Sequence, residues 1–210
     1  MILNEEKIVQ LMQIPTGNIA DNNPNGTVLS HPLKALNPLI HMIGRAFIVE
    51  CAPGDNLALY RGIKEAEEGD VLVFDCKGYC QAGHFGDMMA NACKKKGIAG
   101  VIVNGTTRDY EDILKMKFPL YSLGYCPDGT TKNFKGEIKE EIRINGKKIS
   151  KGDLLIGDGD GVVVIPKNEE NEVIEKAILK HHKEKMILEE IDKGKSILEI
   201  YGFDKILDNA

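Results

Sequence analysis

The chain lacks the features that define several common protein classes. Its 210 residues hold only five cysteines, an odd number, and their spacings do not make a paired metal knuckle. No apolar run approaches the length of a membrane span, and residues 1–6 lack both the basic start and the apolar core of an export signal. We therefore expect reduced thiols and a soluble, cytoplasmic protein.

Basic residues are also fewer than acidic ones, 27 against 32. The formal net charge is −5, and because nucleic-acid binding depends on neutralising phosphates, this balance argues against a broad nucleic-acid interface. The densest basic cluster, Lys94-Lys95-Lys96, falls at the C-terminus of an expected helix, where cations favour the helix dipole. We interpret this cluster as a solvated helix end.

No internal repeat, low-complexity tract or linker divides the chain. With 42% hydrophobic residues it is long enough for one well-cored domain over residues 1–210. Residues 1–40 are expected to form an N-terminal cap or arm, with a helix over about residues 5–13 and a turn-rich passage after it. Residues 168–202 are expected to form C-terminal helices, the first of them long.

The middle of the chain alternates short apolar runs with helical patterns. Strands are expected at residues 46–49, 71–74 and 101–103, with helices over residues 56–67 and 88–96 between them. This alternation favours an α/β fold in which helices cover a sheet.

The C-terminal half has a different pattern. Residues 141–146 are typical of one arm of a hairpin, and residues 154–156 and 162–165 of two strands that meet at the turn Asp158-Gly159-Asp160-Gly161. The two aspartates resemble a metal-binding loop, but the glycines and the short spacing favour a tight turn. One sheet layer is therefore expected to be mainly antiparallel.

The most informative stretch joins a helix start to the end of the next strand. In Gly86-Asp87-Met88-Met89 the first amides of the helix have no partner one turn back, so they could bind an anion. Arg108-Asp109 follows the strand expected at residues 101–103 and places a cation and a carboxylate on a loop at a strand end. Ligand chemistry is common at such positions.

Three further features need interpretation. Gly54-Asp55-Asn56 is typical of a helix N-cap. His84, just before the site, either contacts substrate or has a surface or gating role. On the helix expected over residues 168–191, Glu184 falls near the middle of an apolar stripe, with His181 on the same face. Either Glu184 is ion-paired or partly exposed, or it marks where the stripe meets a neighbouring subunit and a polar site.

Four blocks of the chain carry a family resemblance: Pro53-Gly54-Asp55-Asn56-Leu57-Ala58-Leu59, Glu68-Gly69-Asp70-Val71-Leu72-Val73-Phe74-Asp75, Gly97-Ile98-Ala99-Gly100-Val101-Ile102-Val103-Asn104-Gly105 with Arg108-Asp109, and Gly152-Asp153 through Asp158-Gly159-Asp160-Gly161-Val162. In this order they resemble the RraA-like family, which includes the 4-hydroxy-4-methyl-2-oxoglutarate aldolases. The likeness extends from about residue 16 to residue 202. Two segments depart from the family: residues 16–23 keep an aspartate but lack the common Asp-Ala-Leu, and the insert at residues 76–81 has no assigned role.

The resemblance implies a layered α/β/β/α sandwich, similar to swivelling β/β/α folds, that assembles as a homotrimer or as a hexamer of two trimers. Active sites then lie between subunits. In the aldolase branch of the family a divalent cation, usually Mg²⁺ or Mn²⁺, holds a 2-oxo acid. Carried over by position, Asp109 would face the metal and Arg108 would contact the keto oxygen of the substrate.

The same resemblance assigns the pyruvyl group to the helix start after Gly86, where the backbone amides of Met88 and Met89 would bind it. Asp87 would lie close to a metal-bound water. Glu184 of the adjacent subunit would complete the site. Such a role would explain why a carboxylate lies within the apolar stripe.

The residue types suit this chemistry. Cleavage of a carbon–carbon bond beside a 2-oxo acid leaves a pyruvate enolate, whose charge needs a Lewis acid or an iminium. The expected site contains no lysine, whereas a hard cation held by few carboxylates suits magnesium, and Arg108 can stabilise the enolate oxygen. We therefore expect a metal-dependent carbon–carbon lyase that cleaves a 4-hydroxy-2-oxo acid to pyruvate and also decarboxylates oxaloacetate.

The alternative is a regulatory protein that binds an endoribonuclease without catalysis. That branch of the family lacks the aspartate at the position of Asp109, and this chain retains it, which favours the enzyme. A methyltransferase finds no support, because no glycine-rich nucleotide loop follows the first expected strand. The expected partners are a small 2-oxo acid and further copies of the chain, with neither nucleic acid nor membrane.

Overall fold

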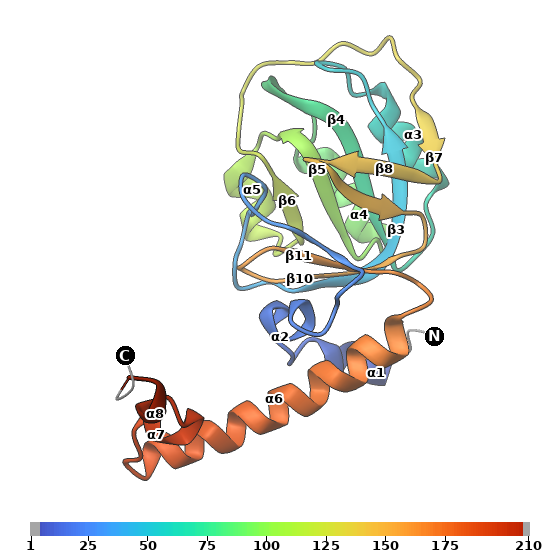
Figure 1. Ribbon diagram of the computed structural model, residues 1–210. Coiled ribbons are helices and arrows are strands. Elements are labelled where there is room, and N and C mark those ends of the chain that lie inside the picture. The colour runs from blue at the N-terminus through green and yellow to red at the C-terminus, as the bar shows by residue number, and fades with distance from the viewer. Residues whose placement is uncertain (1–4, 208–210) are drawn as a thin grey trace.

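A computed structural model describes residues 5–207 of the chain (Figure 1). The expectation that the chain lacks an export signal concerns residues 1–6, and of these residues 1–4 lie outside the described residues. Within the described part, no helix combines the length and the apolar character needed to span a membrane.

The strands and helices expected between residues 46 and 103 are present as β3, α3, β4, α4 and β5. The helices are α1 (Glu5–Leu11), α2 (Thr16–Ala20), α3 (Leu57–Glu65), α4 (Asp87–Lys95), α5 (Tyr110–Lys115), α6 (Glu170–Asp192), α7 (Ile197–Tyr201) and α8 (Asp204–Leu207). The strands are β1 (Thr27–Leu29), β2 (Lys34–Ala35), β3 (Met42–Glu50), β4 (Asp70–Gly83), β5 (Gly100–Thr106), β6 (Leu120–Ser122), β7 (Glu137–Lys139), β8 (Glu141–Ile144), β9 (Lys147–Ser150), β10 (Leu154–Gly157) and β11 (Val162–Ile165).

One mixed sheet organises these elements, with strand order β1-β11-β10-β3-β4-β5-β6-β2 and β7 paired to the end of β3. β3, β4, β5 and β6 run parallel, so their carboxyl ends lie at one edge. β10, β11 and β1 pair antiparallel, and β8 and β9 form a separate hairpin. Both expected hairpins and the antiparallel layer are thus confirmed, while the parallel edge is where ligands bind in α/β proteins.

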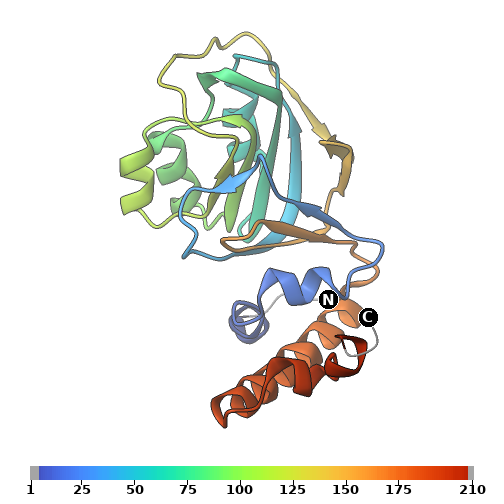
Figure 2. The ribbon, with the colours of Figure 1, turned by 60° about the vertical axis from the view of Figure 1, so that its left-hand side comes forward.

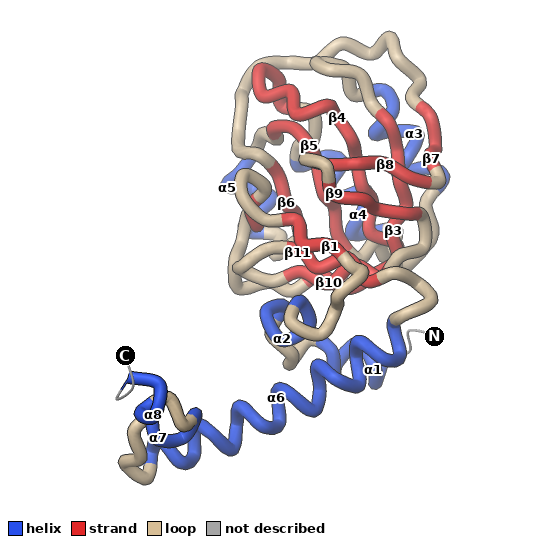
Figure 3. The backbone as a smooth tube through the Cα atoms, in the orientation of Figure 1, coloured by secondary structure: helices blue, strands red, loops and turns tan. Residues whose placement is uncertain are grey.

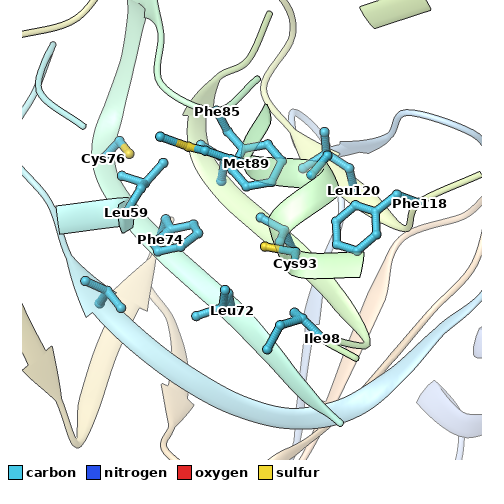
Figure 4. Close-up of a cluster of buried hydrophobic side chains, with 14 of the residues drawn as sticks. Leu59, Leu72, Phe74, Cys76, Phe85, Met89, Cys93, Ile98, Phe118 and Leu120 are labelled. Atoms are coloured by element: carbon cyan, nitrogen blue, oxygen red, sulfur yellow. The ribbon is translucent and has the colours of Figure 1, made fainter. Parts of the chain in front are cut away.

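Three buried clusters lie between four layers, which confirms the expected α/β/β/α sandwich. Around Phe74 and Phe85, helices α3, α4 and α5 pack on one face of the parallel strands (Figure 4). The β8–β9 hairpin packs on the opposite face (Figure 3). Beyond β10 and β11 lie α1, α2 and α6, packed around Ile174. Leu155 belongs to the second cluster and Leu154 to the third, because successive side chains point to opposite faces of a strand.

The long C-terminal helix α6 is fastened to the sheet at its first turn. Glu170 is buried there and forms an ion pair with Arg45 on β3. Figure 2 shows α6, α1 and α2 together below β10 and β11, whereas the helices of the first cluster lie beside the parallel strands. Beyond Ala177 the helix leaves the core, and Leu179 and Leu188 are exposed. Only the first half of the expected apolar stripe is therefore buried within one chain.

The turn-rich passage expected after the first helix contains helix α2, so that prediction was wrong. The carboxylate of Asp158 accepts hydrogen bonds from the N–H and the hydroxyl of Thr16, at 2.9 and 2.8 Å, and Ile19 is buried in the third cluster. These stabilising contacts come from distant parts of the chain. Asp158 also donates its N–H to the carbonyl of Gly161, which closes the tight turn expected there.

The lysine cluster at the end of α4 is more than a solvated helix end. The ammonium of Lys94 donates to the carbonyl of Met116, which follows α5, and that of Lys96 donates to the carbonyl of Ile63 in α3. Cations here pair with unsatisfied carbonyls at the ends of two neighbouring helices. The cluster thereby ties three helices together on one face of the sheet.

Candidate active site

The candidate site forms where two loops meet at the carboxyl edge of the parallel strands. One loop joins β4 to α4, and the other joins β5 to α5. The N–H of Arg108 donates to the carbonyl of Phe85 at 2.9 Å, which joins the second loop to the first. The segments Gly86-Asp87-Met88-Met89 and Arg108-Asp109 are thereby brought together.

Two glycines permit this close approach. A Cβ atom on Gly86 would lie 2.4 Å from Oδ2 of Asp109, and one on Gly83 would lie 2.7 Å from Cβ of Arg108. The φ of Gly86 is −135°, which any residue adopts, so the need for glycine comes from the space and not from the backbone.

Asp109 holds an uncommon backbone conformation at the centre of the site. Its φ of 58° and ψ of 38° are left-handed, a region in which aspartate and asparagine are enriched. Its Oδ2 accepts the N–H of Asp87 at 3.3 Å and lies 3.5 Å from Nε of Arg108. The Arg108 and Asp109 side chains are 47% and 35% exposed, so both can reach a ligand that arrives from solvent.

The start of α4 presents one unpaired amide where the sequence predicted two. The carboxylate of Asp87 accepts the N–H of Met88 at 2.7 Å, whereas the N–H of Met89 has no hydrogen-bond partner within residues 5–207. The Met88 side chain is exposed, and Met89 packs in the core beside Phe85 (Figure 4). An anion at this helix start would meet the Met89 amide directly and compete with Asp87 for the Met88 amide.

A cavity of about 270 Å³ opens beside Arg108 and Asp109. Two tyrosines that the sequence analysis missed form part of its wall, with the rings of Tyr110 and Tyr125 edge to face and 4.7 Å between centroids. Burial raises the pKa of Tyr125, with Tyr110 acting in the same direction, so its hydroxyl stays protonated at neutral pH. The lining residues are Arg108, Asp109, Tyr110, Tyr125, Cys126 and Pro127.

His84 is fully buried, so the expected surface role is wrong, while contact with substrate and a gating role stay predictions. The N–H of Gly54 donates to its Nε2 at 3.1 Å, which leaves the proton on Nδ1 to donate to the carbonyl of Thr106 at 3.2 Å. Burial lowers the pKa of His84. The histidine thereby holds the loop before α3 to the end of β5. The same loop contains the expected N-cap segment, in which the Asp55 carboxylate accepts the N–H of Leu57, the first residue of α3.

Glu184 lies on α6, which extends away from the sheet (Figure 1). Within the chain its partners lie on α2 and α6, and neither helix contributes to the candidate site. Its carboxylate accepts from the side-chain amide of Asn18 at 2.7 Å and lies 3.7 Å from the ammonium of Lys180. It is partly exposed, so the ion-paired interpretation describes it within one chain. A role between subunits stays a prediction.

The oxygen donors at the site fit a hard divalent cation that keeps most of its water. The backbone N–H of Asp87 donates to the carboxylate of Asp109, and solvent reaches the carboxylates of both residues. No group of three histidine, cysteine or acidic side chains that could enclose a metal occurs in the part of the chain that is described. Magnesium is commonly held by one or two carboxylates with water and substrate oxygens, whereas zinc takes three or four protein ligands.

Parallel strands that end in a cation, a carboxylate and a helix start are an arrangement at which α/β proteins commonly bind small anionic ligands. The chain belongs to the RraA-like family: the sequence profile of that family, described as Aldolase/RraA, matches residues 16–164. The resemblance found in the sequence is therefore confirmed.

The chain is similar to proteins named as aldolases and to a protein named as an inhibitor of RNA processing. A Halalkalibacterium halodurans protein, provisionally named 4-hydroxy-4-methyl-2-oxoglutarate aldolase, is 39% identical over 170 residues, or 81% of each chain. A Thermus thermophilus 4-hydroxy-4-methyl-2-oxoglutarate aldolase is 28% identical over 155 residues, which cover 74% of this chain and 94% of the relative. The structure of the RNA-processing inhibitor RraA from Thermus thermophilus is 28% identical, with a TM-score of 0.67 over 72% of this chain and 92% of that one.

Proposed function

We propose that the protein is a divalent-metal-dependent aldolase that cleaves a 4-hydroxy-2-oxo acid to pyruvate, with accompanying oxaloacetate decarboxylase activity. The observation that carries this proposal is the hydrogen bond between the N–H of Asp87 and the carboxylate of Asp109, beside the Arg108 guanidinium. It joins an anion-binding helix start, a carboxylate and a fixed cation at one point. The aldolase names of two relatives support the same reaction.

Each residue has a distinct part in binding. The carboxylate of the 2-oxo acid lies at the start of α4, against the unpaired Met89 amide and the Met88 amide. Arg108 points its guanidinium at the keto oxygen, where negative charge develops as the enolate forms. Asp109 would hold Mg²⁺ or Mn²⁺, which would supply a Lewis acid for the negative charge that develops on the substrate.

The reaction moves one electron pair and one proton. The C3–C4 bond breaks, and its electron pair becomes the enolate of pyruvate. The 4-hydroxyl oxygen becomes the carbonyl oxygen of the second product and loses its proton, for which the Asp87 carboxylate is the proposed base. A proton returned to C3 completes pyruvate. Oxaloacetate gives the same enolate when its C4 carboxylate leaves as carbon dioxide.

Glu184 completes the site from a neighbouring subunit of a homotrimer or hexamer. Two features of α6 support this role: Leu179, Met186 and Leu188 are exposed in the single chain, and Glu184 lies in the same stretch of the helix. Association of copies through that half of the helix would bury the apolar side chains and bring the carboxylate into a polar site.

The deciding measurement is pyruvate release from 4-hydroxy-4-methyl-2-oxoglutarate and from oxaloacetate, with Mg²⁺ or Mn²⁺ and with excess chelator. We expect pyruvate in the presence of metal and its loss on chelation. Absence of pyruvate from both substrates, with protein whose circular dichroism shows it to be folded, would contradict the proposal.

A second candidate function is regulation of RNA processing by protein binding. The inhibitor name of the RraA structure from Thermus thermophilus supports it. The two functions differ in their requirements, because binding of an endoribonuclease needs neither the metal nor turnover. Capture of an endoribonuclease by metal-free protein that releases no pyruvate would favour the regulator.

A further inference from the structure

A second cavity, of about 900 Å³, lies between the β8–β9 hairpin and the segment before α6. It shares no lining residue with the cavity beside Arg108 and Asp109. The carbonyl of Asp153 in its wall accepts the N–H of Ala46 on β3, whose register partner is Val71 at the start of β4. The candidate active site lies at the carboxyl ends of these strands, so the second cavity is a separate place in the fold.

Positive charge converges on this second cavity. Five basic and two acidic residues line it, in a chain whose formal net charge is −5. Most of the basic residues come from the hairpin and the turn after it, and Lys167 comes from the segment before α6. Folding therefore builds a local excess of positive charge against the overall balance of the chain. The basic residues are Arg143, Lys147, Lys148, Lys151 and Lys167.

The two acidic residues in the wall have other partners. The carboxylate of Asp153 is buried and accepts the N–H of Ser150 at 2.8 Å and the N–H of Lys167 at 3.3 Å. The carboxylate of Glu169 accepts from the side-chain amide of Asn25 at 3.2 Å. Within residues 5–207 neither carboxylate forms an ion pair, so the positive charge of the cavity is not neutralised by them.

The chain itself relieves little of the repulsion among these cations. Arg143 lies directly opposite Lys148 on the antiparallel ladder of the hairpin, where like charges destabilise a sheet. Lys148 pairs with Glu141 at 2.7 Å, but both side chains are exposed, and exposed pairs contribute little in water. A bound anion would offset this repulsion.

Two lysines on different sides of the cavity are free to contact such an anion. Lys147 and Lys167 have no carboxylate within ion-pair distance in the described part of the chain, and solvent reaches both side chains. One lies on the hairpin and the other before α6. The contact between copies proposed above uses α6 beyond Ala177, away from Lys167.

The residue types in the wall favour phosphate groups. Ammonium groups and the planar guanidinium form charge-assisted hydrogen bonds with phosphate oxygens, and each phosphate carries up to about two negative charges. The lining residues include no aromatic side chain in the part of the chain that is described, so a nucleobase would have no ring on which to stack. The volume suits a small molecule.

We propose that this cavity binds a small anion that carries two or more phosphate groups and no aromatic base. Its phosphates contact Arg143 and Lys147 of the hairpin and Lys167 before α6, and the anion thereby bridges the two segments. Inorganic polyphosphates and bisphosphorylated metabolites share this chemistry. Binding requires neither the metal nor the proposed aldolase reaction.

Isothermal titration calorimetry of the full chain in metal-free buffer tests the site, with inorganic tripolyphosphate and fructose 1,6-bisphosphate as probes. We expect saturable binding of at least one probe, ~10-fold or more tighter than that of inorganic phosphate or citrate. The tighter probe shows whether the phosphates are adjacent or separated by a carbon skeleton. It should also raise the midpoint of thermal unfolding.

Variants locate the binding. Lys147→Gln and Lys167→Gln each remove a cation that has no carboxylate partner in the described residues, so each should weaken binding by ~10-fold and leave the unliganded protein as stable as the wild type. Lys95→Gln is the matched control, because Lys95 is an exposed lysine in the last turn of α4, outside the cavity wall. It should bind the probe as the wild-type protein does.

Several outcomes would overturn the proposal. Absence of saturable binding by both probes is the first. Citrate that binds as tightly as the better probe would indicate a carboxylate site, and an oligouridylate that does so would indicate a nucleic-acid surface. Equal losses of affinity in Lys95→Gln and Lys147→Gln would show general attraction to positive charge. Pyruvate release enters none of these measurements, so the proposed function stands or fails separately.

Discussion

Oδ2 of Asp109 accepts the backbone N–H of Asp87 at 3.3 Å, across 22 positions of the chain. This bond joins the loop after β5 to the first turn of α4. A carboxylate at a helix start is favoured by the helix dipole, so the contact positions Asp109 while it leaves its other oxygen available. The proposed metal ligand and the proposed anion site are thus one structural unit.

Replacement of Asp109 by asparagine should remove turnover and keep the fold. Asparagine tolerates the left-handed backbone at this position but carries no charge to hold a divalent cation. We expect kcat for pyruvate release to fall by about 100-fold or more, with an unchanged circular dichroism spectrum. Unchanged turnover would remove Asp109 from the mechanism.

Arg108→Lys should be nearly as damaging although the charge is kept. The planar guanidinium can contact the keto oxygen and Asp109 at once, and a point charge on a flexible chain cannot reproduce this geometry. We expect a loss of about 100-fold in kcat/KM. Near-normal rates would argue against a role for Arg108 in stabilising the enolate.

Gly86→Ala tests the space beside Asp109. The added Cβ would lie 2.4 Å from Oδ2, so the carboxylate must move, whereas the backbone of residue 86 accepts alanine. We expect a loss of about 10- to 100-fold in kcat with little change in the midpoint of thermal unfolding. Gly129→Ala, where a Cβ meets nothing within 4 Å, is the control and should keep full activity.

Mixed assemblies test Glu184. Glu184→Gln and Asp109→Asn are each expected to be inactive, yet mixed oligomers would contain sites with both wild-type side chains. Random mixing in equal amounts should restore roughly a quarter of wild-type activity if one chain completes the site of another. Glu172→Gln, a change on the exposed side of α6 where the carboxylate pairs with Lys176, should retain activity throughout. No recovery in verified mixed oligomers would leave Glu184 structural.

His84 should make stability depend on pH. Burial lowers its pKa in the folded protein, so the unfolded chain binds more protons as the pH falls through the ordinary value of about 6.5. The free energy of unfolding should therefore decrease from that pH downward and level off below the folded-state pKa. The free energy of unfolding, measured with urea at several pH values, should depend less steeply on pH in His84→Gln than in the wild-type protein. His182→Gln, a change at an exposed position, should keep the pH dependence of the wild-type protein.

Much of the regular secondary structure follows from local sequence patterns. The apolar runs that became β3, β4 and β5 are bounded by turn residues, and the turn at Asp158 is encoded by its alternating glycines. Helix α2 could not be predicted in this way, because Asp158 and the third core cluster hold it from far along the chain. Local composition indicates a turn there, and tertiary contacts impose a helix.

The candidate site was only partly visible in the sequence. The Arg108-Asp109 pair stands out because it follows a buried strand. Tyr125 was missed because β6 separates it from Tyr110, and only the folded chain brings the two rings together. His84 was misjudged for a similar reason: both of its hydrogen-bond partners come from other segments, at Gly54 and Thr106.

The left-handed backbone of Asp109 also bears on how easily this protein could change its role. The conformation favours glycine, asparagine and aspartate, although Lys77 and Lys117 also adopt it, and a single nucleotide change converts an aspartate codon to a codon for glycine or asparagine. Such a change would discard the charge and preserve the loop. If the proposed catalysis depends on this charge, one such change would remove it and keep the surface for binding, which is consistent with a family whose members are named both as aldolases and as an inhibitor of RNA processing.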